Sequence, residues 1–136
     1  VATQEEALAL PEVHEKLERS LKKLWGMCQS ILDDILASVQ DFPYGIRWIC
    51  KQLHSICKET FPQAPKEDFY RMIGYFAYYR YINLGIVIPD SKSFDILKQD
   101  LSIYSRRCCV DMARIFQKMF NLSLYEEGED HRNNIF

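Results

Sequence analysis

The sequence predicts an all-α fold, a helical bundle of about four helices in a single domain over residues 1–136. Apolar residues recur at spacings of three and four over long stretches, which is the period of a helix with one buried face. No stretch alternates polar and apolar residues for long, so strands are not expected. A chain of 136 residues with 48% apolar content has enough apolar side chains for one core.

The first helix is expected from Glu12 to Val39. Pro11 stands where a proline in the first helical turn is tolerated, and Pro43 with Gly45 ends the pattern. We expect this helix to pack against the third one. Its apolar stripe consists of Val13, Leu17, Leu21, Leu24, Cys28, Ile31, Ile35 and Val39.

Two further apolar stripes predict the second and third helices. The second stripe comprises Ile46, Ile49, Cys50, Leu53, Ile56 and Cys57 and ends at Phe61-Pro62. The third helix should open after Pro65, where the acids Glu67 and Asp68 suit the positive end of the helix dipole. It should continue through Phe69, Met72, Ile73 and Phe76 to about Tyr81.

The rest of the chain predicts a loop and a fourth helix. Gly85 and Pro89 predict a loop over residues 83–95, although the stretch 85–88 is apolar enough to lie inward. The fourth helix should run from about Asp100 to Phe120. Its four core candidates are Ile103, Val110, Ile115 and Met119.

Composition indicates a reduced, intracellular protein. No run of eighteen apolar residues exists, so no membrane span is expected. The start Val1-Ala2-Thr3-Gln4 lacks a signal peptide and an initiator Met, which suggests a piece of a longer protein. An odd number of cysteines without a Cys-x-x-Cys pair predicts reduced thiols in or near the core: Cys28, Cys50, Cys57, Cys108 and Cys109.

Charge is segregated along the chain. Residues 42–118 carry twelve basic against seven acidic side chains, a net charge of +5, while residues 1–41 carry −4 and residues 119–136 carry −3. A basic middle could attract an acidic protein surface or phosphates, because summed charge steers encounter. The alternative is a set of scattered, solvated helix faces.

No ordinary catalytic machinery is visible. The sequence has no glycine-rich phosphate loop, so the chain is not expected to bind nucleotide by itself. The histidines His14, His54 and His131 fall on separate segments, without a partner at metal-ligand spacing. No nucleophile motif frames the Ser, Cys and His residues. No cofactor, metal or nucleic acid is expected as a partner.

The segment from Tyr78 to Pro89 carries a motif. Ras GTPase-activating domains have a signature Phe-Leu-Arg, two residues, then Asn-Pro-Ala-Ile, two more and Pro, and this segment keeps Arg80, Asn83, Ile86 and Pro89 in register. The IQGAP branch opens this signature with two tyrosines, as Tyr78-Tyr79 do here. Four more elements of that branch occur in order along the chain: Pro43-Tyr44-Gly45-Ile46-Arg47, Phe61-Pro62, Phe94-Asp95-Ile96 after the signature, and Ala113-Arg114 followed by Gln117 and Asn121. The chain therefore resembles the C-terminal half of an IQGAP-type Ras-GAP-related domain, part of the Ras-GAP-like helical fold.

The resemblance implies a small GTPase of the Rho or Ras family as partner. The GTPase-binding residues it implies are Tyr79, Arg80, Asn83, Arg114, Gln117 and Asn121. No catalytic residue is implied in this chain; Arg80 would support an arginine-finger loop that lies outside it. Leu84 and Gly85 depart from the family's Pro-Ala, and Arg114 replaces a Lys, which keeps the charge but changes the hydrogen-bond geometry.

Two functions remain open at this stage. The first is a GTPase-binding module of an IQGAP-like scaffold that regulates GTPase signalling, the actin cytoskeleton and cytokinesis. It would be a regulator without catalysis of its own rather than an enzyme. It would act in the cytoplasm, at the cytoskeleton or at the cell cortex. Its cytoskeletal partners would bind other parts of the parent protein. The second is part of an active GTPase-activating domain whose finger lies elsewhere. Two plainer interpretations are that Tyr75, Tyr78 and Tyr81 only pack and that Arg80 caps carbonyls.

Overall fold

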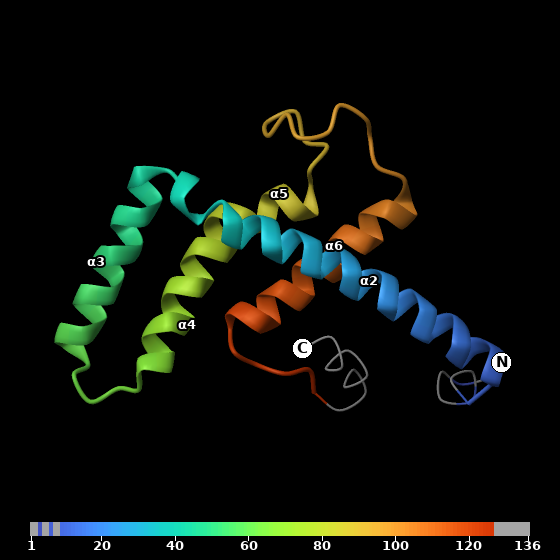
Figure 1. The fold of residues 1–136 in the computed structure, drawn as a ribbon, viewed down its shortest axis with the longest axis horizontal. Coiled ribbons are helices and arrows are strands. Elements are labelled where there is room, and N and C mark those ends of the chain that lie inside the picture. The colour runs from blue at the N-terminus through green and yellow to red at the C-terminus, as the bar shows by residue number, and fades with distance from the viewer. Residues whose placement is uncertain (1–2, 4–5, 7–8, 127–136) are drawn as a thin grey trace.

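The computed structural model describes Thr3, Glu6 and residues 9–126, and this part of the chain is helical without a strand. Figure 1 shows an elongated arrangement in which α2 crosses the molecule, α3 and α4 form a hairpin at one end, and α6 lies across α2. The all-α prediction is confirmed. The predictions for the start of the chain at Val1 and for His131 lie outside the described residues.

The predicted first helix is present as α2, Pro11–Ala37, with Pro11 in the first turn. It ends two residues earlier than expected, because a short 3₁₀ turn, η1 at Val39–Asp41, follows it. Cys28 is the buried residue of this helix, while Leu24, Ile31 and Leu32 pack against the same core. Burial is therefore concentrated in the second half of the helix.

The next two helices, α3 (Tyr44–Thr60) and α4 (Lys66–Ala77), lie side by side and are joined by a short turn (Figure 1). They meet where Cys57 donates a 3.1 Å sulfur hydrogen bond to Met72 and where the rings of His54 and Phe69 pack at a near-right angle, 6.2 Å apart. Ile56, a predicted core residue, is 56% exposed. Its position in the helix is about 100° from that of Cys57, and α3 packs on one side against α4.

The predicted loop over residues 83–95 is wrong for its first part. After α4 the chain makes a π-helical turn, η2 at Tyr78–Ile82, and continues as helix α5, Asn83–Val87. Gly85 costs only about 1 kcal/mol in a helix, and Ile82 and Ile86 pack one turn apart against the core. Helix α5 ends at Val87, two residues before Pro89.

The fourth helix is present as α6, Ile103–Phe120, and Ser102 caps its start by accepting a 3.1 Å hydrogen bond from the Ser105 amide. Of the predicted core residues Ile115 is buried, but Ile103 is 78% exposed, so that assignment is wrong. Ile103 is the first residue of α6, and the buried residues of α6 begin only at Met112.

A salt bridge connects α6 to the segment after α5. Arg106 binds the Asp90 carboxylate at 2.5 Å and donates a 3.1 Å hydrogen bond to the Val87 carbonyl. Asp90 also accepts a 2.8 Å hydrogen bond from the Leu101 amide. These bonds lower the pKa of Asp90 below its ordinary value, with the Arg106 hydrogen bond as the largest cause. The two ends of the segment between α5 and α6 are thereby held together.

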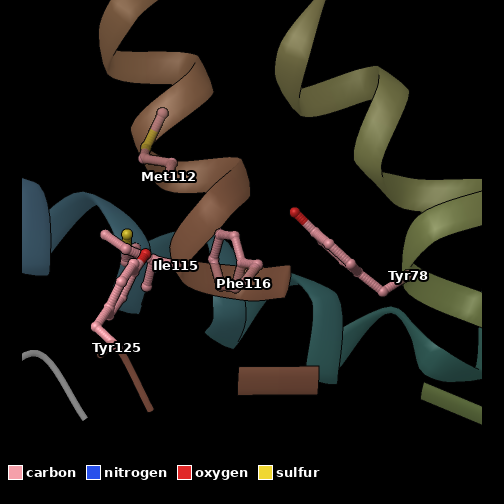
Figure 2. Close-up of a cluster of buried hydrophobic side chains, with 6 residues drawn as sticks. Tyr78, Met112, Ile115, Phe116 and Tyr125 are labelled. Carbon is pink, nitrogen blue, oxygen red and sulfur yellow. The ribbon is translucent and has the colours of Figure 1, made fainter. Parts of the chain in front are cut away.

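The core is formed around α6 (Figure 2). Phe116 and Tyr78 are each 1% exposed, and their rings lie 6.0 Å apart. In Figure 2, Tyr78 and Tyr125 approach α6 from opposite sides, with Phe116 and Ile115 between them. The buried cluster consists of Cys28, Tyr78, Met112, Ile115, Phe116 and Tyr125.

The expected packing of the first helix against the third is wrong for α4, but Tyr78, near the end of the predicted third helix, shares the core cluster with Cys28 of α2. Helix α2 packs against α6, because Phe116 and Tyr78 fill the space next to Cys28. Between α2 and α4 lies instead an apolar groove of about 470 Å³, lined by Leu36 and Tyr70 among others. The sequence shows that α2 has an apolar face but does not show which helix covers it.

Four of the five thiols lie in or near the core, as expected, and Cys108 is exposed. Burial raises the pKa of the Cys28 thiol to about 11, so at neutral pH it is an uncharged and unreactive core group. Among the described residues, no helix combines the length and the apolar character needed to cross a membrane.

Candidate functional site

A polar pocket of about 480 Å³ lies along the C-terminal half of α6. Three of the residues assigned to GTPase binding line it together: Arg114, Gln117 and Asn121. They stand at i, i+3 and i+7, so they share one face of the helix. The neighbours Ala113, Ile115 and Phe116 point into the core and fix that orientation.

The polar groups of this face are available to a partner. The side chains of Arg114, Gln117 and Asn121 make no hydrogen bond or ion pair with another described residue. Arg114 offers a planar fork of donors that matches a carboxylate, and the two amides offer further donors and acceptors. The pocket can therefore receive an acidic or amide side chain from another molecule.

Three further residues line the pocket that the sequence did not predict: Lys118, Ser123 and Tyr125. Ser123 and Tyr125 follow α6, so their position depends on how the helix ends. The amide of Ser123 donates a 3.0 Å hydrogen bond to the Lys118 carbonyl, and that of Leu122 donates one to the Met119 carbonyl. This is the pattern of a Schellman motif, in which a glycine usually holds the position of Leu122. Because Leu122 stands where a glycine usually marks this motif, the turn after α6 could not be predicted from the sequence.

Asn83 lies at the junction of the signature segment with α6. The buried hydroxyl of Tyr78 donates a 2.7 Å hydrogen bond to the Ala113 carbonyl and lies 3.2 Å from the amide oxygen of Asn83. Burial raises the pKa of Tyr78 above its ordinary value, so the hydroxyl stays protonated. Asn83 is thus placed beside the residue that precedes Arg114.

Tyr79 and Arg80 lie on the surface and do not line the α6 pocket. The ring of Tyr79 stacks on that of Tyr75 at 5.1 Å, and the guanidinium carbon of Arg80 lies 5.8 Å from the Tyr79 ring centroid. Arg80 also lines a second pocket of about 600 Å³ with Phe42 and Phe94. Within the described part of the chain its guanidinium caps no carbonyl.

The tyrosines of the signature segment divide into two groups. Tyr78 is a core residue that stacks on Phe120 at 4.8 Å. Tyr75, Tyr79 and Tyr81 are each 37–41% exposed. The interpretation as packing holds fully for Tyr78. Tyr81 packs its ring 5.4 Å from that of Phe42 and Tyr75 stacks on Tyr79, while both stay partly exposed.

The described residues form no group of three His, Cys, Asp or Glu side chains that could hold a metal ion. The candidate site residues are two uncharged amides, an arginine and exposed tyrosines; arginine and tyrosine are enriched at protein interfaces.

Known proteins resemble this chain over most of its length. The Ras GTPase-activating-like protein gapA of Dictyostelium discoideum is 40% identical over 129 residues, 95% of this chain and 15% of the relative. The human Ras GTPase-activating-like protein IQGAP2 is 34% identical over 98% of the chain and 9% of the relative. The human RasGAP-activating-like protein 1 is 35% identical over 77% of the chain and 13% of the relative. The chain thus spans less than one sixth of the length of these relatives.

The sequence profile of one family matches residues 1–121, which includes the signature segment, α6 and the polar pocket on α6 up to Asn121. That family is described as GTPase-activator protein for Ras-like GTPase. The chain therefore belongs to the RasGAP family of GTPase-activator proteins for Ras-like GTPases.

Proposed function

We propose that this chain binds a small GTPase of the Rho or Ras family through the α6 pocket and the neighbouring signature segment, without accelerating GTP hydrolysis by itself. The observation that carries the proposal is the shared position of Arg114, Gln117 and Asn121 in one pocket with no partner among the described residues. Membership of the RasGAP family supports a GTPase as the partner.

The chemistry of the pocket favours an acidic surface on the partner. Arg114 is exposed and unpaired, and Arg107 lies exposed two turns earlier on α6. Charged groups across an interface raise the rate of encounter and fix its register. Tyr75 and Tyr79, stacked on each other, add a rigid aromatic surface with polar tips.

A second candidate is a catalytically active GTPase-activating domain to which this chain contributes only a part. The name of the gapA relative, Ras GTPase-activating-like, supports this alternative. Arg80 would then support a finger loop outside this chain, and its exposed guanidinium on Tyr79 is accessible for that role. An arginine in a finger loop elsewhere in the parent protein would favour this candidate.

We further propose that the parent protein acts in the cytoplasm, at the cytoskeleton or the cell cortex, and regulates GTPase signalling, actin organisation and cytokinesis. The resemblance to the IQGAP type supports this proposal. Cytoskeletal partners would bind other parts of the parent. Localisation of the tagged parent protein in dividing cells tests this part of the proposal.

The binding proposal is tested by titrating the chain against Rho- and Ras-family GTPases loaded with GDP or a non-hydrolysable GTP analogue. We expect saturable binding to at least one GTPase, weakened by salt because charged groups contribute. Absence of binding to every GTPase in both nucleotide states would contradict the proposal.

A further inference from the structure

Two contacts of Lys118 hold the segment after α6, residues 122–126, against the helix. Its ammonium group donates a 3.1 Å hydrogen bond to the Leu124 carbonyl. The same group lies 5.4 Å from the centroid of the Tyr125 ring. A hydrogen bond from a charged donor and a cation–π contact each contribute more than a neutral surface contact.

The backbone of Lys118 adds to this arrangement. Its carbonyl oxygen accepts a 3.0 Å hydrogen bond from the Ser123 amide and lies 3.5 Å from the Ser123 hydroxyl, which donates to it. Leu122 adopts φ of 51°, a left-handed conformation that is unfavourable for a residue with a side chain. The turn is therefore kept by contacts of the surrounding residues rather than by the preference of Leu122 itself.

Tyr125 fixes the far end of the segment. It is 7% exposed and belongs to the buried cluster with Ile115 and Cys28. Figure 2 shows its ring beside Ile115. The chain after α6 is thus held at two points, by Lys118 at Leu124 and by the core at Tyr125.

The held segment forms part of the α6 pocket. Ser123 and Tyr125 line it together with the helix residues Arg114 and Gln117. Because Lys118 is engaged with Leu124 and Tyr125, its charge is directed at the segment, and Arg114 remains as the pocket's unpaired cation. Without the segment, these side chains would lie on an open helix face.

We propose that Lys118 and Tyr125 are positioning residues for GTPase binding: they hold residues 122–126 as a wall of the α6 pocket and so orient it toward the partner. This proposal rests on the proposed function of the same pocket. It adds two residues and a segment that lie outside the signature motif, and it assigns Lys118 a role other than contact with the GTPase.

The test uses Lys118→Met, which keeps the length of the side chain but removes the donor and the charge, together with Lys118→Arg, which keeps both. Tyr125→Leu removes the ring without changing any charge in the pocket, and circular dichroism checks that this core variant folds. Lys51→Met, an equal change on the exposed face of α3, is the control for charge, because α3 contributes no residue to the pocket.

Two readouts are measured on the full chain: hydrogen–deuterium exchange of residues 121–126 by mass spectrometry, and the Kd for the GTPase. We expect Lys118→Met and Tyr125→Leu to speed exchange and to weaken binding by roughly three- to tenfold, the effect of one lost hydrogen bond. Lys118→Arg should restore both, and Lys51→Met should change neither.

Three outcomes separate the possibilities. Unchanged exchange in Lys118→Met would overturn the proposal, because the segment would not depend on Lys118. Faster exchange with unchanged Kd would also overturn it, while the proposed binding function would stand. If the chain without substitutions binds no GTPase, the proposed function itself is overturned, whatever the exchange data show.

Discussion

The hydroxyl of Tyr78 donates a 2.7 Å hydrogen bond to the carbonyl oxygen of Ala113, and this bond joins the signature segment to α6. Tyr78 begins the π-helical turn, and Ala113 immediately precedes Arg114. The bond therefore links two parts of the chain that the family resemblance assigns to one surface.

Replacing Tyr78 by Phe should lower the free energy of unfolding by about 1 kcal/mol, because one buried hydrogen bond is lost while the ring still stacks on Phe120. Tyr78→Ala should cost about 3–5 kcal/mol, since it leaves a cavity in the core. Urea denaturation followed by circular dichroism measures both. Tyr104→Phe is the control, because Tyr104 is 81% exposed, and an equal loss there would contradict the argument.

Replacing Arg114 by Glu should weaken GTPase binding by at least about tenfold, because a carboxylate would then face the acidic surface of the partner. The melting temperature should hardly change, since exposed substitutions usually stay within about 0.5 kcal/mol. Kd measured at low salt tests this. Lys51→Glu makes the same charge change on the exposed face of α3, which contributes no residue to the pocket, and should have a much smaller effect. Parent-like binding of Arg114→Glu would show that the pocket is not the binding site.

The chain alone should not accelerate GTP hydrolysis, because the finger arginine that the family's activators use is expected outside it. A finger contributes roughly 10³–10⁵ in rate. Single-turnover hydrolysis by the bound GTPase is the measurement, with the GTPase alone as control. An acceleration above about tenfold, which is far below the rate enhancement of a finger, would favour the second candidate, an active GTPase-activating domain.

Arg80→Ala should change the free energy of unfolding of this chain by no more than about 0.5 kcal/mol. The guanidinium is exposed, and among the described residues its contact is with the Tyr79 ring. In the presence of the finger loop, the same change should disturb loop order as well as binding. Thermal melts of the chain and of the parent protein separate the two effects. A large loss in the chain alone would reveal a structural role for Arg80.

Acid should weaken the link between Asp90 and Arg106. The pKa of Asp90 lies below its ordinary value of 3.8, so its ion pair stabilises the fold above that value and is lost as the pH falls through the lower folded pKa. Asp90→Asn should lower the urea midpoint at neutral pH and reduce its dependence on pH below about 4. Asp34→Asn, on the exposed face of α2, is the control and should leave the urea midpoint at neutral pH unchanged.

Much of the fold follows from local sequence. The apolar stripes predict α2, α3, α4 and α6, because a helix with one buried face must repeat apolar residues with its own period. The line of Arg114, Gln117 and Asn121 on one helical face also follows from spacing alone, and the structure places all three in one pocket. Their role in GTPase binding stays a prediction.

Other features were decided by tertiary structure. The burial of Phe116 and the exposure of Ile103 depend on where the partner elements lie along α6, which helical periodicity does not specify. The continuation of the helix through Gly85 depends on the core that receives Ile86, whose burial offsets the cost of the glycine. The wall of the pocket depends on Lys118 and Tyr125, which hold a left-handed turn at Leu122. A leucine adopts this conformation only when contacts of the surrounding structure stabilise it against its own backbone preference.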